Sequence, residues 1–227
     1  MVVERATESR EAAERLGPRE RILVAARALF YGQGIHATGV EQLAEAAGVS
    51  KRTLYQLFGS KDGLVAAYLT WMSQHAPTNE RHLRRAGLTP RERLLALFGR
   101  PTSSVAVRGC PIHNAAVEIT NPRHPGAAVI HAHKEGFLRQ LVDTAAQAGA
   151  RDPETLGRQL FVLFEGATAL GTSTGELASY DYARSVAQAL VDQALVHQAL
   201  PAPPAAGPEA TRPPEHGGWP TPAGRSP

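Results

Sequence analysis

Hydrogen-bond donors are concentrated in one stretch of the sequence, from Ser50 to Lys61, which holds three basic residues and no acidic one. At helical spacing Leu54 and Phe58 fall four residues apart on one face, which leaves the polar side chains on the other. Basic side chains neutralise phosphates, Thr and Gln can read base edges, and a Tyr hydroxyl can hold a phosphate and fix the register. The stretch therefore predicts a surface that binds double-stranded DNA. Its candidate contact residues are Thr38, Lys51, Arg52, Thr53, Tyr55, Gln56 and Lys61.

A second group of chemically capable side chains lies in the stretch RGCPIHNAAVE, which contains His113 and the one cysteine of the chain, Cys110. A thiol at a helix N-terminus can have a lowered pKa, and a Cys/His pair can act as a nucleophile if a third group orients the base. Asn114 and Glu118 are candidates for that group, but no signature of a protease or transferase accompanies them. We therefore assign no catalytic residue and expect no enzyme. The alternatives are a redox or electrophile sensor acting through Cys110, a ligand cavity lined by these side chains, and simple packing.

The two histidines of His131-Ala-His133 do not predict a metal site. On a helix, residues two apart point to opposite sides, whereas chelation by a helix requires a spacing of about four. No Gly-rich loop of the kind that cradles phosphates occurs in the sequence. We expect no metal and no cofactor.

The DNA-binding stretch must be positioned by the helix and turn that precede it. Thr38 and Glu41 form a capping-box pattern that predicts the start of a helix running to about Ala47. Gly48 ends this helix because glycine tolerates positive φ, and Ser50 is the expected N-cap of the next one. A solvated helix face would explain the basic residues alone but not this turn, so the pattern indicates a helix-turn-helix.

The rest of the chain up to residue 200 is also patterned as helices, so the predicted fold class is all-α. We expect a first helix from Pro18 to about Gly32–Gly34, which completes a three-helix unit, and a fourth from Ser60 to Pro77. Later helices are expected from Thr89, over Pro111–Ile119, over about Pro125–Ala148, over about 153–175 and over about 180–200, with a loop at Gly99–Gly109. The helix that begins at Pro153 is apolar nearly all round, which predicts burial on all sides.

The sequence from Arg19 to Leu64 resembles the DNA-binding domain of the TetR family of bacterial repressors. The residues RILVAARALFYGQGIHATGVEQLAEAAGVSKRTLYQLFGSKDGL carry the resemblance, and RGCPIHNAAVE looks like a segment of some members. Many members place an aromatic residue or His where this chain has Leu57, so a phosphate contact is not carried over to that position. The resemblance implies a repressor released from a palindromic operator by a small molecule. It also implies a homodimer in which the helices at about 153–175 and 180–200 form a four-helix bundle with their symmetry mates; an intramolecular core is the alternative.

These signals divide the chain into a flexible arm (1–17), a helix-turn-helix DNA-binding domain (18–64), an effector-binding and dimerisation domain (65–200) and a disordered Pro-rich tail (201–227). The expected effector is small and mainly apolar with one or two hydrogen-bonding groups. Its pocket is expected to be lined by Trp71, Phe98, Cys110, His113, Asn114, His133, Phe137 and Phe164.

The composition is typical of a globular protein, and several features of the sequence bear on the cellular compartment in which it works. The formal net charge is only +3, so the positive charge that holds DNA must be local. No run of about 18 apolar residues could span a membrane, and the N-terminal stretch has no secretory pattern. One cysteine cannot form an internal disulfide. We therefore expect a cytoplasmic protein.

Overall fold

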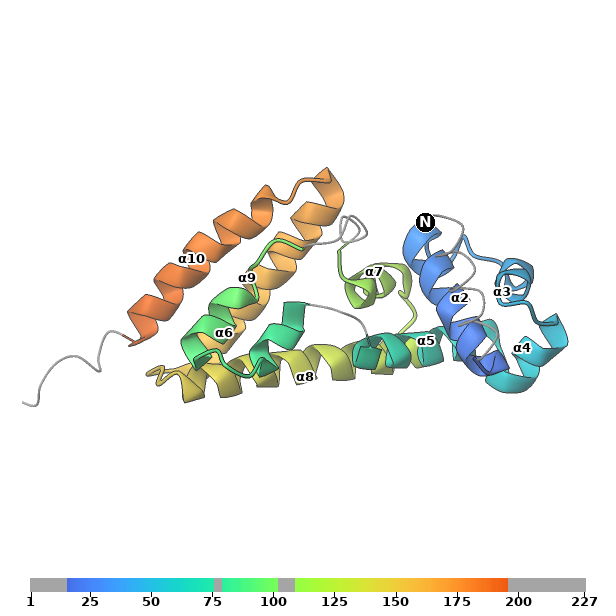
Figure 1. Cartoon of the computed structure of the whole chain (residues 1–227), viewed down its shortest axis with the longest axis horizontal. Coiled ribbons are helices and arrows are strands. Elements are labelled where there is room, and N and C mark those ends of the chain that lie inside the picture. The colour runs from blue at the N-terminus through green and yellow to red at the C-terminus, as the bar shows by residue number, and fades with distance from the viewer. Residues whose placement is uncertain (1–15, 76–78, 102–108, 196–227) are drawn as a thin grey trace, which may run out of the picture. The chain divides into compact units, whose positions relative to one another are not determined.

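The computed structural model describes residues 16–75, 79–101 and 109–195, and every regular element within these ranges is a helix. The all-α class is therefore confirmed for the described part of the chain. The elements in order are α2 (Pro18–Gln33), α3 (Val40–Ala46), α4 (Lys51–Phe58), α5 (Lys61–His75), the 3-10 helix η1 (Asn79–Arg84), α6 (Pro90–Ala96), α7 (Pro111–Glu118), α8 (Pro125–Gln147), α9 (Pro153–Thr174) and α10 (Ala178–Leu195) (Figure 1). Outside the described residues lie residues 1–15 of the expected N-terminal arm, Pro77, residues 102–108 of the expected loop, residues 196–200 of the last expected helix and the Pro-rich tail.

Most helices begin where a local capping signal places them. The Ser50 hydroxyl accepts a hydrogen bond from the amide of Thr53 at 3.0 Å and caps α4. Thr89 and Glu92 form a reciprocal capping box at the start of α6, and the carboxylate of Asp152 caps α9. Each contact satisfies an amide that the first turn of a helix leaves unpaired. The cap expected at Ser50 and the helix starts expected at Thr89 and Pro153 are confirmed.

The capping box expected at Thr38 and Glu41 is wrong. Helix α3 begins one residue later than that pattern requires, with Gly39 as its N-cap and no side-chain cap. The Thr38 side chain is fully buried, and its hydroxyl donates to the carbonyl oxygen of Gly34 at 2.6 Å. Thr38 therefore satisfies the end of α2 and not the start of α3. The helix η1 was also not expected, because so short a 3-10 turn carries no apolar period.

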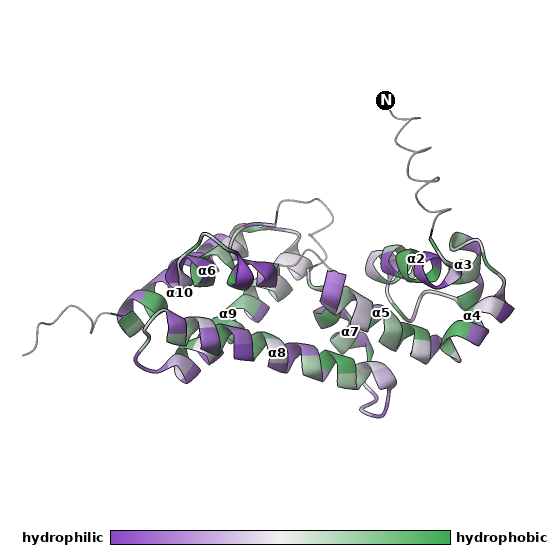
Figure 2. Ribbon diagram, turned by 60° about the horizontal axis from the view of Figure 1, so that its bottom comes forward, coloured by the Kyte–Doolittle hydropathy of each residue, from purple (hydrophilic) through white to green (hydrophobic). Residues whose placement is uncertain are grey.

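Two clusters of buried side chains hold the described helices together. One draws on α2 to α5 and α7, and the other on η1, α6, α8, α9 and α10. Helix α8 contributes to both: Val129 and Ile130 pack against the first cluster, whereas Phe137 and Leu141 are buried in the second. Hydrophobic and hydrophilic residues accordingly alternate along α8 (Figure 2). Among the described residues no helix is both long and apolar enough to cross a bilayer.

The burial of α9 on every side, expected from its apolar sequence, is not observed. Leu156, Leu160 and Phe164 are buried, but Val162 and Leu170 are exposed on another face of the same helix. One chain alone therefore does not cover α9.

The start of α5 packs so closely on the end of α4 that Gly63 has no room for a side chain. A Cβ atom at Gly63 would lie 2.2 Å from the backbone carbonyl oxygen of Phe58. Real carbon and oxygen atoms do not approach so closely, so one of the two helices would have to move.

Replacing Gly63 with Ala should lower the free energy of unfolding by about 1–3 kcal/mol, the usual cost of forcing an atom into a filled site. Urea unfolding followed by circular dichroism measures this change. The matched control is Gly136→Ala in α8, where the new Cβ would meet nothing nearer than the guanidinium end of Arg139 at 3.9 Å. The control should be neutral or stabilising, because Ala favours a helix over Gly. A Gly63→Ala variant as stable as the parent would contradict the close packing.

Candidate nucleic-acid interface

A tight turn sets the direction of α4 relative to α3. Gly48 has a φ of 61°, a conformation that glycine adopts without a steric cost. The Gly48 amide donates to the carbonyl oxygen of Glu45 at 3.0 Å, and the Val49 amide donates to that of Ala44 at 2.9 Å. Ser50 then caps α4. Residues 40–58 therefore form the helix-turn-helix that the sequence predicts.

One face of α4 is anchored in the first core cluster. Leu54 is fully buried there, and Phe58 packs against the cluster from its edge. The guanidinium carbon of Arg19, in α2, lies 5.3 Å from the centre of the Phe58 ring. These contacts fix the rotation of α4 about its axis and turn the opposite face to solvent.

The outward face of α4 carries the predicted DNA-contacting side chains. Lys51, Arg52, Tyr55 and Gln56 are exposed, and Thr53 and Lys61 are half-exposed. The Thr53 hydroxyl lies 2.9 Å from the Ser50 hydroxyl. We call the set Lys51, Arg52, Thr53, Tyr55, Gln56 and Lys61 the recognition surface. Thr38 does not join it, because its side chain is buried and its hydroxyl is used within the fold.

A carboxylate whose pairing with Lys51 the sequence did not predict lies beside the recognition surface. Glu41, in α3, has one carboxylate oxygen 2.6 Å from the ammonium nitrogen of Lys51. The hydrogen bond from Lys51 lowers the pKa of Glu41, and the same bond raises the pKa of Lys51. Helical spacing within α4 could not show this pair, because its two members lie on different helices across the turn.

Three of the residues expected to line an effector pocket lie together in the second core cluster. The rings of Phe98 and Phe137 each pack edge-on against Phe164, with centroid distances of 6.1 and 5.3 Å. Trp71 does not belong to this group: it packs against the first cluster and stacks on His75 at 5.1 Å. The aromatic part of the expected lining is therefore divided between two cores.

The two histidines of the expected lining contact carboxylates of other helices. His113 Nδ1, in α7, lies 3.3 Å from a carboxylate oxygen of Glu165, in α9, and Glu165 also binds Lys134, in α8, at 2.5 Å. His133, in α8, lies 3.2 Å from Glu80, and both side chains are almost wholly buried. Asn114 is half-buried and lies in the first turn of α7. Its backbone N–H donates to the Cys110 carbonyl oxygen at 3.0 Å. No group of three or more metal-ligating side chains occurs within the described ranges.

The Cys110 thiol does not have the surroundings of a reactive nucleophile or sensor. It is buried in the first core cluster, and that burial raises the pKa of the thiol to about 11. At neutral pH the group is therefore a protonated thiol, which is a poor nucleophile. His113 would be the base of a Cys/His pair, and its Nδ1 atom contacts Glu165. The environment of Cys110 thus argues against both the redox alternative and the enzyme alternative.

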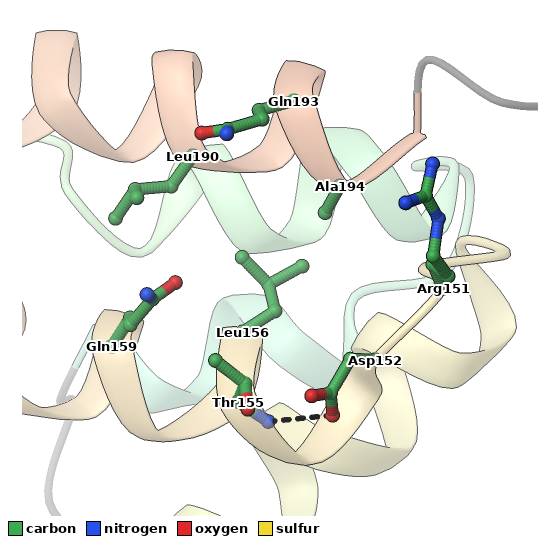
Figure 3. A pocket seen from close by; sticks show the side chains of 8 residues that line it. All are labelled: Arg151, Asp152, Thr155, Leu156, Gln159, Leu190, Gln193 and Ala194. Carbon is green, nitrogen blue, oxygen red and sulfur yellow. Dashed lines mark hydrogen bonds between the residues drawn. The ribbon is translucent and has the colours of Figure 1, made fainter. Parts of the chain in front are cut away.

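A shallow cleft opens between α9 and α10 (Figure 3). It has a volume of about 210 Å³ and an apolar floor of Leu156, Leu190 and Ala194. Its polar lining is Arg151, Asp152, Thr155, Gln159 and Gln193. None of the eight residues expected to line an effector pocket is among them.

Comparison with known proteins identifies the helix-turn-helix and extends the likeness to most of the chain. Residues 22–68 match the sequence model of bacterial regulatory proteins of the tetR family. A TetR-type transcriptional regulator of Streptomyces avermitilis, known from its crystal structure, is 36% identical over 79% of this chain and 98% of its own, with a TM-score of 0.68. A regulator of Mycobacterium tuberculosis is 32% identical over 155 residues, which are 62% of this chain and 67% of the relative. The chain belongs to the TetR family.

Membership of the TetR family makes the protein a DNA-binding transcriptional regulator. A TetR-family regulator of Streptomyces coelicolor is a second structural relative, 27% identical over 78% of this chain with a TM-score of 0.68. The transcriptional activator FasR of Mycolicibacterium smegmatis is 38% identical over 78 residues, and the match spans only 36% of FasR. The likeness to FasR therefore supports the family and does not decide the direction of regulation.

Because burial raises the pKa of Cys110 to about 11 from an ordinary 9.0, its thiolate fraction near neutral pH should be about a hundredfold below that of an unburied thiol. Alkylation by iodoacetamide, followed by mass spectrometry at pH values of about 7 to 9, should therefore be slow in the folded protein and fast in urea. The rate in the folded protein should rise with pH throughout this range. A folded thiol that reacts at neutral pH as fast as the unfolded one would restore the sensor hypothesis.

Proposed function

We propose that the protein is a dimeric repressor that binds a palindromic operator and is released from it by a small effector. The observation that carries the proposal is the anchored helix α4, which buries Leu54 and exposes Lys51, Arg52, Tyr55 and Gln56. An exposed second helix with cationic and amide side chains is the geometry that enters a major groove. The protein would act in the cytoplasm. It would have no catalytic activity, because its relatives are named as transcriptional regulators.

The dimer would form through α9 and α10, which lie side by side (Figure 1). Val162 is 69% exposed and Leu170 56% exposed on α9, while Tyr182 is 74% exposed and Val186 48% exposed on α10. Exposed apolar side chains on neighbouring helices mark a surface that another molecule covers. A second copy would pair these two helices with its own and form a four-helix bundle.

The cleft of Figure 3 supports the same dimer interface. Thr155 and Gln159 lie on the helical line that leads to Val162, and Gln193 lies seven residues, about two turns, beyond Val186. The cleft and the exposed apolar residues therefore share the outer faces of α9 and α10. Side chains of a second copy would fill the cleft, and the two recognition surfaces would then meet half-sites about 34–36 Å apart.

The effector would act between α7, α8 and α9, where aromatic and polar side chains occur together. The ring cluster around Phe164 offers an apolar surface, and the contacts among His113, Lys134 and Glu165 offer hydrogen-bonding groups. A small and mainly apolar molecule with one or two polar groups fits these neighbours. The effector would have to displace the packed rings. It would therefore bind a conformation with rearranged rings more tightly than the packed conformation.

Helix α7 would carry such a rearrangement to the helix-turn-helix. The Tyr31 hydroxyl, in α2, donates to the Gly109 carbonyl oxygen at 2.9 Å, just before α7 begins. At the other end of α7, the carboxylate of Glu118 accepts from the His36 amide at 2.9 Å, in the loop that leads to α3. The ring Nε2 of His36 lies 2.9 Å from the Glu118 carbonyl oxygen. A difference of about 3 kcal/mol in effector affinity between two geometries would lower operator affinity roughly 150-fold.

Arg52→Ala and Tyr55→Phe should weaken binding to the duplex that the protein selects from a random-sequence library. The loss of the Arg52 charge should also make the slope of log affinity against log salt about one unit shallower if Arg52 meets a phosphate. Fluorescence anisotropy over a salt series measures both quantities. The control is Arg139→Ala in α8, which removes the same charge from an exposed side chain outside the recognition surface. An Arg52→Ala variant that binds like this control would contradict the proposed contact.

Val162→Glu should shift the protein from dimer to monomer in sedimentation equilibrium, because it buries a charge in the proposed bundle. The matched control is Val117→Glu in α7, since Val117 is 67% exposed and Val162 is 69% exposed. The control should remain dimeric. Equal behaviour of the two variants would place the dimer interface elsewhere.

A further inference from the structure

The ion pair between Glu41 and Lys51 joins the two helices of the helix-turn-helix across their outer face. The ammonium nitrogen and the carboxylate oxygen are 2.6 Å apart, and both side chains are largely exposed, at 54% for Lys51 and 73% for Glu41. The Glu41 carboxylate also lies near the start of its own helix, with one oxygen 3.9 Å from the place a Cβ of Gly39 would take. Because both side chains are exposed and Lys51 belongs to the recognition surface, the pair lies on the side from which a duplex would approach α4 under the proposed function.

The pair removes one positive charge from the recognition surface of the free protein. Lys51, Arg52 and Lys61 are the cations of that surface, and Lys51 is the one held by a carboxylate of α3. A DNA phosphate and the Glu41 carboxylate must compete for the same ammonium group. Lys51 can reach a phosphate only if it leaves Glu41.

We propose that Glu41 lowers the affinity of the helix-turn-helix for DNA of any sequence, because Lys51 must leave this carboxylate to give its whole charge to a phosphate. The inference rests on the proposed function. An exposed ion pair and a single loose phosphate contact are of similar strength, because both are contacts between charges in water. Exchanging one for the other gains nothing, so the pair persists in complexes of arbitrary sequence.

The operator differs because base contacts hold the duplex in one register. Tyr55 lies one turn beyond Lys51 on the same face of α4, and Gln56 is exposed next to Tyr55. Once their contacts fix the duplex, a phosphate stays opposite Lys51 and can compete with Glu41. On the operator Lys51 gains a phosphate contact but loses the ion pair, so Glu41 weakens operator binding as well as binding to arbitrary sequence, which rests almost wholly on phosphate contacts.

The test compares Glu41→Gln with the parent protein on two labelled duplexes, one of mixed sequence and one selected by the parent protein from a random-sequence library. On the mixed duplex the variant should bind roughly twofold to fivefold more tightly. Its slope of log affinity against log salt should be steeper by about 0.9, the value for one added phosphate contact. On the selected duplex the variant should also bind more tightly by a similar factor, but its salt slope should be unchanged, because Lys51 already contacts a phosphate there.

Two further variants separate the ion pair from the general effect of lost negative charge. Glu45→Gln removes an exposed carboxylate from the same helix, one turn further on, and should leave the salt slope unchanged. In a Lys51→Gln background, Glu41→Gln should no longer steepen the slope, because there is no ammonium group to release. The measurement uses the full chain, and none of these exposed positions contributes to a core cluster.

Equal gains and equal slopes for Glu41→Gln and Glu45→Gln would overturn the inference, since only the total charge would then matter. An unchanged affinity of Glu41→Gln on the mixed duplex would also overturn it, while salt-dependent binding by the parent protein would leave the proposed function intact. Failure of the parent protein to bind any duplex would overturn the proposed function and the inference together.

Discussion

The burial of Leu54 is the contact on which the DNA-binding surface depends. Helix α4 has only 8 residues, and a helix of that length does not persist alone in water. It forms because Ser50 caps its first turn and because Leu54 is fully buried among α2, α3 and α5. The same burial fixes which side chains of α4 face outward. Any change that loosens Leu54 would disorder the recognition surface without touching a DNA-contacting residue.

The described structure also gives a physical basis for communication between the helix-turn-helix and the rest of the chain. Helix α7 is held at both of its ends by residues near the N-terminal core, through Tyr31 and His36, and its His113 faces Glu165 of α9. Its buried residues Ile112 and Ala115 belong to the first core cluster. Packed elements of this kind move as units, because a close-packed interior does not deform gradually. Helix α7 is therefore a specific candidate for the moving part.

The sequence predicted the parts of the fold that short-range chemistry decides. The turn at Gly48 and the caps at Ser50 and Thr89 involve residues no more than a few positions apart, so their pattern is visible in the chain. Thr38 shows the limit of this reasoning. Its pattern matched a capping box, but the carbonyl oxygen of Gly34 offered its hydroxyl a buried partner, and α3 began one residue later.

Contacts between helices were largely beyond prediction. Helical spacing shows which residues share a face and not what that face meets, so the expected effector lining mixed Phe164 of one core with Trp71 and Cys110 beside the other. The pair of Glu41 and Lys51 was missed for the same reason, since its members lie on two helices. The expectation that α9 is buried on all sides failed at Val162 and Leu170, which are exposed, because an apolar sequence does not show what covers each face of a helix.

The most direct test of the account is a dimethyl sulfate protection experiment on the selected operator. This reagent methylates guanine N7 in the major groove and adenine N3 in the minor groove. Two copies of α4 inserted into successive major grooves should protect guanines in two half-sites about one helical turn apart, on one face of the duplex. Protection confined to adenines, or a single protected half-site on a bound duplex, would contradict the placement of α4 in the major groove of a two-fold operator.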